Sequence, residues 1–186
     1  MKKLVWILVL VLAAGGFVGC KKAEGPKEGA TPSAAVKEYT FEEGIQGWKT
    51  IGKTQISQAT DKQHGGKASL KIAGTGQSGQ WSFARSEKFN ISPGKHYKVA
   101  GWITIESISG NSSSLKCELW QDGKWLKNIE SNWYDLKKRE WQQLTAEFVT
   151  PEGKNLSLSF AIEKRPMDKD VKAVIYVDDI KLEMID

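Results

Sequence analysis

Short runs in which apolar and polar residues alternate constrain this chain more than any other feature. Residues 156–162 read LSLSFAI, and the stretches 97–105 and 174–182 alternate in a similar way. Because successive side chains of a strand point to opposite faces, a period of two predicts half-buried β-strands. No convincing helical pattern occurs outside the N-terminal apolar run.

Turn signals separate these runs, and their spacing predicts the architecture. They are Gly65-Gly66, Pro93-Gly94, Asp122-Gly123 and Pro151 with Gly153. Glycine and proline at such positions mark chain reversals. About eight to ten short strands at this spacing predict an all-β fold, an antiparallel β-sandwich or jelly roll.

The N-terminus has the pattern of a bacterial export signal. Lys2 and Lys3 precede the apolar stretch 4–18, which is shorter than the roughly 20 residues that span a bilayer. The segment Phe17-Val18-Gly19-Cys20 resembles the lipobox of bacterial lipoproteins, although Phe17 departs from the usual leucine. We therefore predict cleavage after residue 19 and a lipid on Cys20 that anchors the protein stably. An ordinary cleaved signal and an uncleaved anchor are the alternatives.

Composition then divides the chain into three segments. Residues 21–35 are rich in Lys, Glu, Gly, Ala and Pro and contain no large apolar side chain, which predicts a flexible linker. We expect a signal peptide at 1–19, a lipidated cysteine and linker at 20–35, and a β-sandwich domain at 36–186. The protein would be a monomer held to a membrane of the bacterial cell envelope, at the outer membrane or the cell surface.

Charge and cysteine usage argue against two classes of function. Loss of the signal removes two lysines and lowers the formal net charge from +5 to +3, and 137–139 is the main basic run. A nucleic-acid partner is therefore not expected. Cys117 lies between Leu115 and Leu119 in a strand-like run, which predicts a small buried thiol. Neither cysteine has the spacing of a metal site.

Six short motifs follow one another along the predicted domain. They are Phe41-Glu42-Glu43-Gly44, Gly47-Trp48, His64-Gly65-Gly66-Lys67-Ala68-Ser69-Leu70, Ser92-Pro93-Gly94-Lys95-His96-Tyr97, Trp141 with Leu144 and Phe148 before Pro151, and Tyr176-Val177-Asp178-Asp179-Ile180-Lys181-Leu182. In this order they resemble the carbohydrate-binding modules of the CenC type, families four and nine, which are galactose-binding-like jelly rolls. The resemblance covers roughly residues 39–183.

The resemblance implies a concave sheet that forms a sugar-binding cleft and a structural calcium ion away from the sugar. Carried over, the calcium ligands are Glu42, the carbonyl of Lys67 and Asp178, a set of hard oxygens that suits calcium. Asp178 shares its parity with Ile180 and Leu182, which predicts an inward carboxylate that needs a partner. The alternative is that Asp178 pairs with a lysine or caps a turn.

Seven tryptophans follow the signal, and a flat indole can cover the apolar face of a sugar ring. In the resembled family Trp48 and Trp141 occupy packing positions, so we expect both in the core. Trp102 and Trp120 have the opposite parity to their apolar neighbours, which predicts outward side chains on which sugars stack.

Further ligand-binding candidates lie at expected strand ends and loops. The aromatic ones are Trp81, Trp125, Trp133 and Tyr134, since exposed aromatic side chains tend to mark a binding surface. Arg85 and Glu118 are candidates to hold hydroxyls or an acidic sugar. The alternatives are that loops bury the aromatic rings and that the charged groups are only solvated.

The sequence favours non-catalytic glycan binding. A protein–protein interaction module of the envelope is the alternative, and a hydrolase of glycosyl bonds, which needs two facing carboxylates, is less favoured. The segment 74–79 matches the dinucleotide-binding glycine pattern, but a strand rather than a helix is expected to follow it. His64 and His96 have no visible nucleophile partner.

Overall fold

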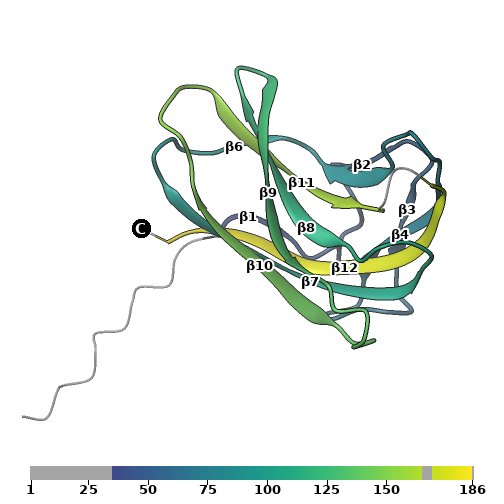
Figure 1. Cartoon of the computed structure of the whole chain (residues 1–186). Helices are drawn as coiled ribbons and strands as arrows, with labels where there is room; N and C mark the ends of the chain where they lie inside the picture. Colours follow the sequence, from purple (N-terminus) through teal and green to yellow (C-terminus); the bar gives the residue numbers. More distant parts are fainter. Residues whose placement is uncertain (1–34, 165–168, 186) are drawn as a thin grey trace, which may run out of the picture. The chain divides into compact units, whose positions relative to one another are not determined.

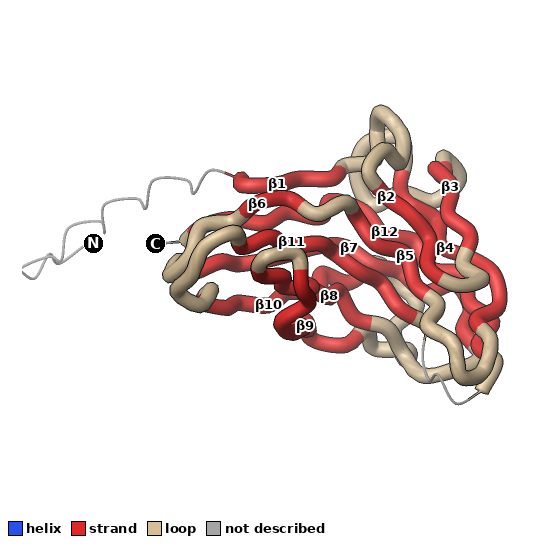
Figure 2. The backbone as a smooth tube through the Cα atoms, turned by 90° about the horizontal axis from the view of Figure 1, so that it is seen from above, coloured by secondary structure: helices blue, strands red, loops and turns tan. Residues whose placement is uncertain are grey.

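The structure is a computed structural model in which residues 35–164 and 169–185 are described. Within these ranges the chain forms strands and no helix (Figures 1 and 2). The strands are β1 (Ala35–Tyr39), β2 (Trp48–Ile51), β3 (Gln55–Ala59), β4 (Ser69–Gly76), β5 (Phe83–Ser86), β6 (Phe89–Asn90), β7 (His96–Ile108), β8 (Ser114–Gln121), β9 (Lys124–Trp133), β10 (Gln142–Val149), β11 (Leu156–Glu163) and β12 (Val171–Met184).

The strands form two antiparallel sheets that pack into a sandwich. Sheet A has the hydrogen-bonded order β10-β7-β12-β4-β3, and β1 pairs with the C-terminal part of β12. Sheet B has the order β2-β5-β11-β8-β9, and β6 pairs with β11. In Figure 1 the long yellow strand β12 runs through sheet A, and β8, β9 and β11 lie above it. The predicted antiparallel β-sandwich is confirmed.

Apolar side chains at every second position fill the space between the sheets. Val99 and Ile103 of β7 face Leu119 and Phe160 of sheet B in one cluster of fully buried residues. Burying such side chains supplies most of the free energy that holds the sheets together. Trp48 is buried in this cluster, as predicted.

Cys117 also lies in the core, as predicted. Complete burial raises the pKa of its thiol, because the thiolate would lose its hydration there. A thiol that stays protonated is a poor nucleophile, so Cys117 acts as a small apolar side chain.

A bulge in β12 overturns the prediction that Asp178 points inward. The register of β12 against β7 shifts between Asp178 and Lys181, and Asp179 has a φ of 46°. The extra residue keeps Ile180 in the core but places Asp178 opposite Trp102, on the outer face of sheet A. Parity could not reveal this, because a bulge changes the period by one residue.

Several predictions fall on parts of the chain that the structure does not describe. Cys20, the signal segment 1–19 and most of the linker 20–35 lie outside the described residues. Strand β1 begins at Ala35, next to the predicted domain boundary. Among the described residues, no helix has the length and apolar character needed to cross a membrane.

Candidate functional site

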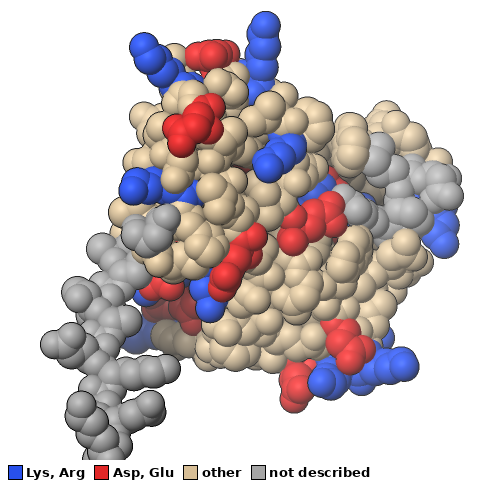
Figure 3. All heavy atoms as spheres, turned by 60° about the vertical axis from the view of Figure 1, so that its left-hand side comes forward, with Lys and Arg blue, Asp and Glu red and all other residues tan. Residues whose placement is uncertain are grey.

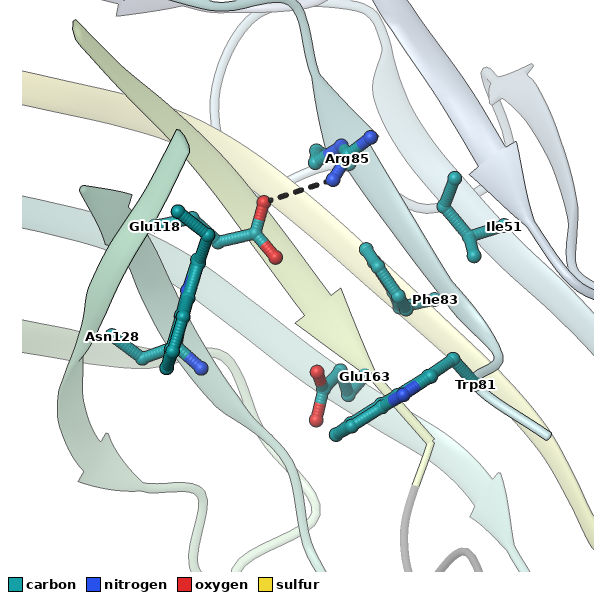
Figure 4. A pocket seen from close by; sticks show the side chains of 8 residues that line it. Ile51, Trp81, Phe83, Arg85, Glu118, Asn128 and Glu163 are labelled. Atoms are coloured by element: carbon teal, nitrogen blue, oxygen red, sulfur yellow. Dashed lines mark hydrogen bonds and ion pairs between the residues drawn. The ribbon is translucent and has the colours of Figure 1, made fainter. Parts of the chain in front are cut away.

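The outer face of sheet B, which is turned away from the core, carries a cavity of about 590 Å³ (Figure 4). Its lining comes from the five strands β2, β5, β11, β8 and β9 and from the segment before β5. The lining residues are Ile51, Trp81, Phe83, Arg85, Glu118, Trp125, Asn128 and Glu163. Phe83 and Arg85 alternate with the buried Ala84, and Glu118 lies between Cys117 and Leu119 of the core. The period of two therefore sends the lining side chains to this face.

One half of the floor is a hydrogen-bonded chain of polar groups. The Arg85 guanidinium lies 3.4 Å from a Glu118 carboxylate oxygen, as the dashed line in Figure 4 shows. The Ser159 hydroxyl donates to the same oxygen at 3.0 Å, and the Trp120 indole N–H lies 3.2 Å from the Ser159 oxygen. Direct partners on β5 and β11 fix the Glu118 carboxylate in place.

A buried ion pair forms the other half of the floor. Lys116 is 1% exposed, and its Nζ lies 2.6 Å from Glu163 and 3.9 Å from Glu130. The ammonium makes no hydrogen bond of good geometry, so these two carboxylates compensate its charge. A buried ammonium is tolerated only when it is paired in this way.

Two exposed tryptophans line the cavity above this polar floor. The side chains of Trp81 and Trp125 are 54% and 56% exposed. The Trp125 indole N–H donates to the Asn128 side-chain oxygen at 2.9 Å, and the Trp81 ring packs edge-on against Phe83. Two flat apolar surfaces beside charged, hydrogen-bonding groups match the two kinds of surface that a sugar presents.

Trp120 projects outward as predicted, but its ring is covered. Lys88 Nζ lies 3.3 Å from the ring centroid, and the Arg85 guanidinium lies 5.6 Å from it. These are cation–π distances. Trp120 therefore binds two cations, and a sugar would have to displace Lys88 to stack on that face.

Trp102 and Trp120 both project outward, as predicted, but they lie on the outer faces of different sheets. Trp102 lies on the outer face of sheet A, opposite Asp178 in register. The His64 imidazole stacks flat on it with ring centroids 3.8 Å apart, and Trp141 packs edge-on against the same imidazole. Trp141 is half-buried beside His64 rather than in the core, which corrects its predicted position.

The structure places the other two aromatic candidates away from the cavity. Trp133 is 43% exposed and pairs in register with Ser114, at the other end of the β8–β9 pair from Trp125. Tyr134 was expected at the surface but is buried in the core. Its hydroxyl donates to the carbonyls of Lys138 and Glu140, which closes the turn before β10.

Glu42, Lys67 and Asp178 gather at one loop, 64–68, beside sheet A. The Glu42 carboxylate accepts the backbone N–H groups of Lys67 and Ala68 at 2.9–3.1 Å. Asp178 is fully buried and accepts N–H groups from His64, Gly65 and Asp179. Burial raises the pKa of Asp178, and these three hydrogen bonds oppose that shift.

This loop fits a calcium ion in part. Calcium takes six to eight oxygen ligands, and two carboxylates that contact the same loop are hard oxygen ligands of the kind it prefers. The same carboxylates already accept five backbone N–H contacts between them. No group of three His, Cys, Asp or Glu side chains suited to a metal occurs within 35–164 and 169–185. A cation there would depend on main-chain oxygens and water for most of its shell.

Two carboxylates line the cavity, as a glycosidase requires, but each is held by a cation. Glu118 is paired with Arg85, and Glu163 is paired with Lys116. A general acid must carry a proton to its substrate. These carboxylates are instead arranged as hydrogen-bond acceptors, which suits binding of hydroxyl groups.

Charged side chains on the face shown in Figure 3 are interspersed, and neither sign gathers into one patch. An extended basic stripe is the usual mark of a nucleic-acid surface. On this face of the described residues no such stripe is visible.

Sequence reasoning missed part of the cavity. Phe83 and Glu163 lie on the polar-facing side of their strands, and strand parity could have identified both. Asn128 pairs with Glu118 in register, but the bulge between Trp120 and Leu119 hides this relation in the sequence. The cover that Lys88 forms on Trp120 depends on side-chain packing and has no sequence signal.

Comparisons with known proteins agree on one kind of domain. A family described as carbohydrate binding domain matches residues 33–169. The endo-1,4-beta-xylanase A of Thermotoga maritima is 24% identical in a 170-residue alignment that covers 87% of this chain and 14% of the xylanase. The chain thus spans about one seventh of that relative's length.

Solved structures share the fold. The CBM22-1 xylan-binding domain from Paenibacillus barcinonensis Xyn10C superposes with a TM-score of 0.62 at 17% identity, covering 84% of this chain and 98% of that domain. The C-terminal family 22 carbohydrate binding module of Clostridium thermocellum Xyn10B gives a TM-score of 0.59 at 17% identity, with coverages of 81% and 92%.

Proposed function

Because this chain belongs to the carbohydrate binding domain family, we propose that it binds a polysaccharide without cleaving it, in the cavity on the outer face of sheet B. The observation that carries the proposal is the pair of exposed tryptophans, Trp81 and Trp125, beside a floor of fixed polar groups. Such an open site binds one face of a chain of sugars and leaves the rest in water.

The proposed ligand is xylan or a similar β-1,4-linked polysaccharide. The relative from Thermotoga maritima is named an endo-1,4-beta-xylanase, and the domain from Paenibacillus barcinonensis is named a xylan-binding domain. This chain resembles only a small part of the xylanase. We therefore propose polysaccharide binding for it and not hydrolysis.

The aromatic and the polar residues of the cavity make different contacts with the sugar. The indoles of Trp81 and Trp125 cover the C–H faces of sugar rings, which removes apolar surface from water. The Glu118 carboxylate accepts hydrogen bonds from hydroxyl groups, and the Asn128 side-chain amide donates hydrogen bonds to them. The ion pairs below them hold these groups in place before the ligand arrives, so little side-chain entropy is lost on binding.

Isothermal titration with soluble xylan tests the proposal. Substituting Trp81→Ala or Trp125→Ala should weaken binding between about fivefold and about a hundredfold, because stacking and apolar contact of one ring contribute about 1–3 kcal/mol. Trp133→Ala is the matched control, since Trp133 is similarly exposed but lies outside the cavity. Equal affinities for all three variants and the unsubstituted protein would refute the site, and no binding to any polysaccharide would refute the function.

A structural calcium ion at Glu42, Lys67 and Asp178 is a second part of the proposal. Its support is that both carboxylates meet the same loop, 64–68. A bound ion would stabilise the folded state by mass action. Thermal unfolding should then shift upward when calcium is added and downward with a chelator, whereas an unchanged midpoint would refute the ion.

Membrane anchoring through Cys20 is the third part, and it rests on the lipobox-like segment 17–20 alone. Expression in a bacterial host with a labelled fatty acid should label the protein and place it in the membrane fraction. Cys20→Ser should abolish the label and release the domain. A labelled Cys20→Ser variant would contradict the assignment.

A further inference from the structure

Three cations and one carboxylate meet at the Trp120 end of the proposed site. Lys49 of β2 is the register partner of Arg85, so both side chains belong to the outer face of sheet B. Lys88 follows β5 and lies over the Trp120 ring. Glu118 is the acidic member of the group.

The positive charge of this cluster is not balanced. Glu118 is engaged by Arg85. Among the described residues no ion pair joins Lys49 or Lys88 to a carboxylate, and the charged groups that act on Lys88 are Arg85, Glu118 and Lys49. Burial and then the repulsion from Arg85 and Lys49 lower the pKa of Lys88. Its cation–π contact with Trp120 opposes this shift.

A negative group from a ligand would remove this imbalance. It would lie between two like charges that now repel each other, and Arg85 offers a planar fork that suits a carboxylate. Arg85 also lines the cavity, so a sugar bound there places its substituents next to Lys88 and Trp120.

We infer that the Trp120 end of the cavity is a subsite for the carboxylate of an acidic sugar, with Lys88 and Arg85 as its binding residues. This rests on the proposed function, because the acidic sugar would be a branch on the polysaccharide that the cavity binds. The ligand class is therefore a uronic-acid-bearing xylan rather than an unsubstituted one. Lys88 leaves the Trp120 ring as it pairs with the carboxylate, and the ring then borders the bound sugar.

A matched pair of ligands tests the inference. Glucuronoxylan is compared with the same polymer after chemical reduction of its carboxyl groups to alcohols, so that only the charge differs. The protein should bind glucuronoxylan about fivefold more tightly, which is the effect of one partly exposed ion pair. High salt should remove this preference, because it screens exposed charges.

Matched variants locate the effect. Lys88→Ala should abolish the preference while binding of the reduced polymer is not weakened, and Lys88→Arg should retain it. Lys172→Ala is the control, since Lys172 is exposed on β12 of sheet A. Equal binding of both polymers by the unsubstituted protein, or a preference that survives in Lys88→Ala, would overturn the inference alone. Binding of neither polymer would overturn the proposed function as well.

Discussion

The outer faces of the two sheets both carry tryptophans, but they use them differently. On sheet A, Trp102 lies under the His64 imidazole, and the loop that contains His64 is fastened by the buried Asp178. On sheet B, Trp81 and Trp125 stand beside an open cavity with little covering them. Outward tryptophans are thus open beside a cavity on one sheet and covered by a loop on the other. What separates the two is the loop that covers sheet A.

The comparison predicts that changes on sheet A reduce stability and leave binding intact. The largest effect should come from Asp178→Ala, which leaves three backbone N–H groups without their acceptor. We expect a loss of about 4 kcal/mol in the free energy of unfolding, measured with denaturant. Asp170→Ala, which removes an exposed carboxylate that accepts the N–H of Ser78, should cost less than about 1 kcal/mol. A similar loss in both variants would show that Asp178 does not hold the loop.

Lys116→Met tests whether the buried ion pair on the outer face of sheet B also contributes to the stability of the fold. The substitution leaves the buried Glu163 without its closest cation, which should lower the free energy of unfolding by about 3 kcal/mol. Adding Glu163→Leu to Lys116→Met should restore most of that stability, because two packed apolar groups can replace a buried ion pair. Denaturant unfolding of the single and double variants measures this. A double variant less stable than the single one would contradict the account of the floor.

Trp102→Ala, set against Trp81→Ala, is the most direct test of the difference between the faces. Loss of the half-buried Trp102 ring should cost about 2 kcal/mol of stability, since it removes the surface on which His64 packs. Its xylan affinity should not change, whereas Trp81→Ala should weaken binding and leave stability nearly unaltered. Isothermal titration with xylan and denaturant unfolding of both variants measure these effects. Reduced xylan affinity in a folded Trp102→Ala variant would contradict the assignment of binding to sheet B alone.

Glu118→Gln should give the smallest effect. It keeps the shape of the side chain but removes the charge that fixes Arg85, so xylan affinity should fall by about 1 kcal/mol. Glu147→Gln is the control, because Glu147 is an exposed acid that pairs with His96 and Lys98 on sheet A. Isothermal titration measures the xylan affinity of both variants. If the two substitutions lower that affinity equally, the effect comes from the net charge of the protein and not from the cavity.

The sequence predicted the architecture and part of the site, and the errors have physical causes. Alternation located the strands and the outward positions of Trp120 and Glu118, because strand geometry is local. It failed at Asp178, where one inserted residue reverses the parity. It placed Trp102 outward correctly but could not show that His64 covers the ring, and Tyr134 was expected at the surface but is buried, since the packing of loops over a side chain depends on residues far away in the sequence.

The pairing of β1 with β12 has a mechanical consequence. Ala35 lies opposite Glu183, and Tyr39 lies opposite Ile180 with its ring packed against Phe160 of the other sheet. A force on the chain that precedes Ala35, directed along β1, would load all the hydrogen bonds between β1 and β12 at the same time. It would not break them one after another. If the domain is tethered at its N-terminus and bound to an insoluble polymer, it experiences such a force. The force then acts on β1, whose pairing with β12 resists shear.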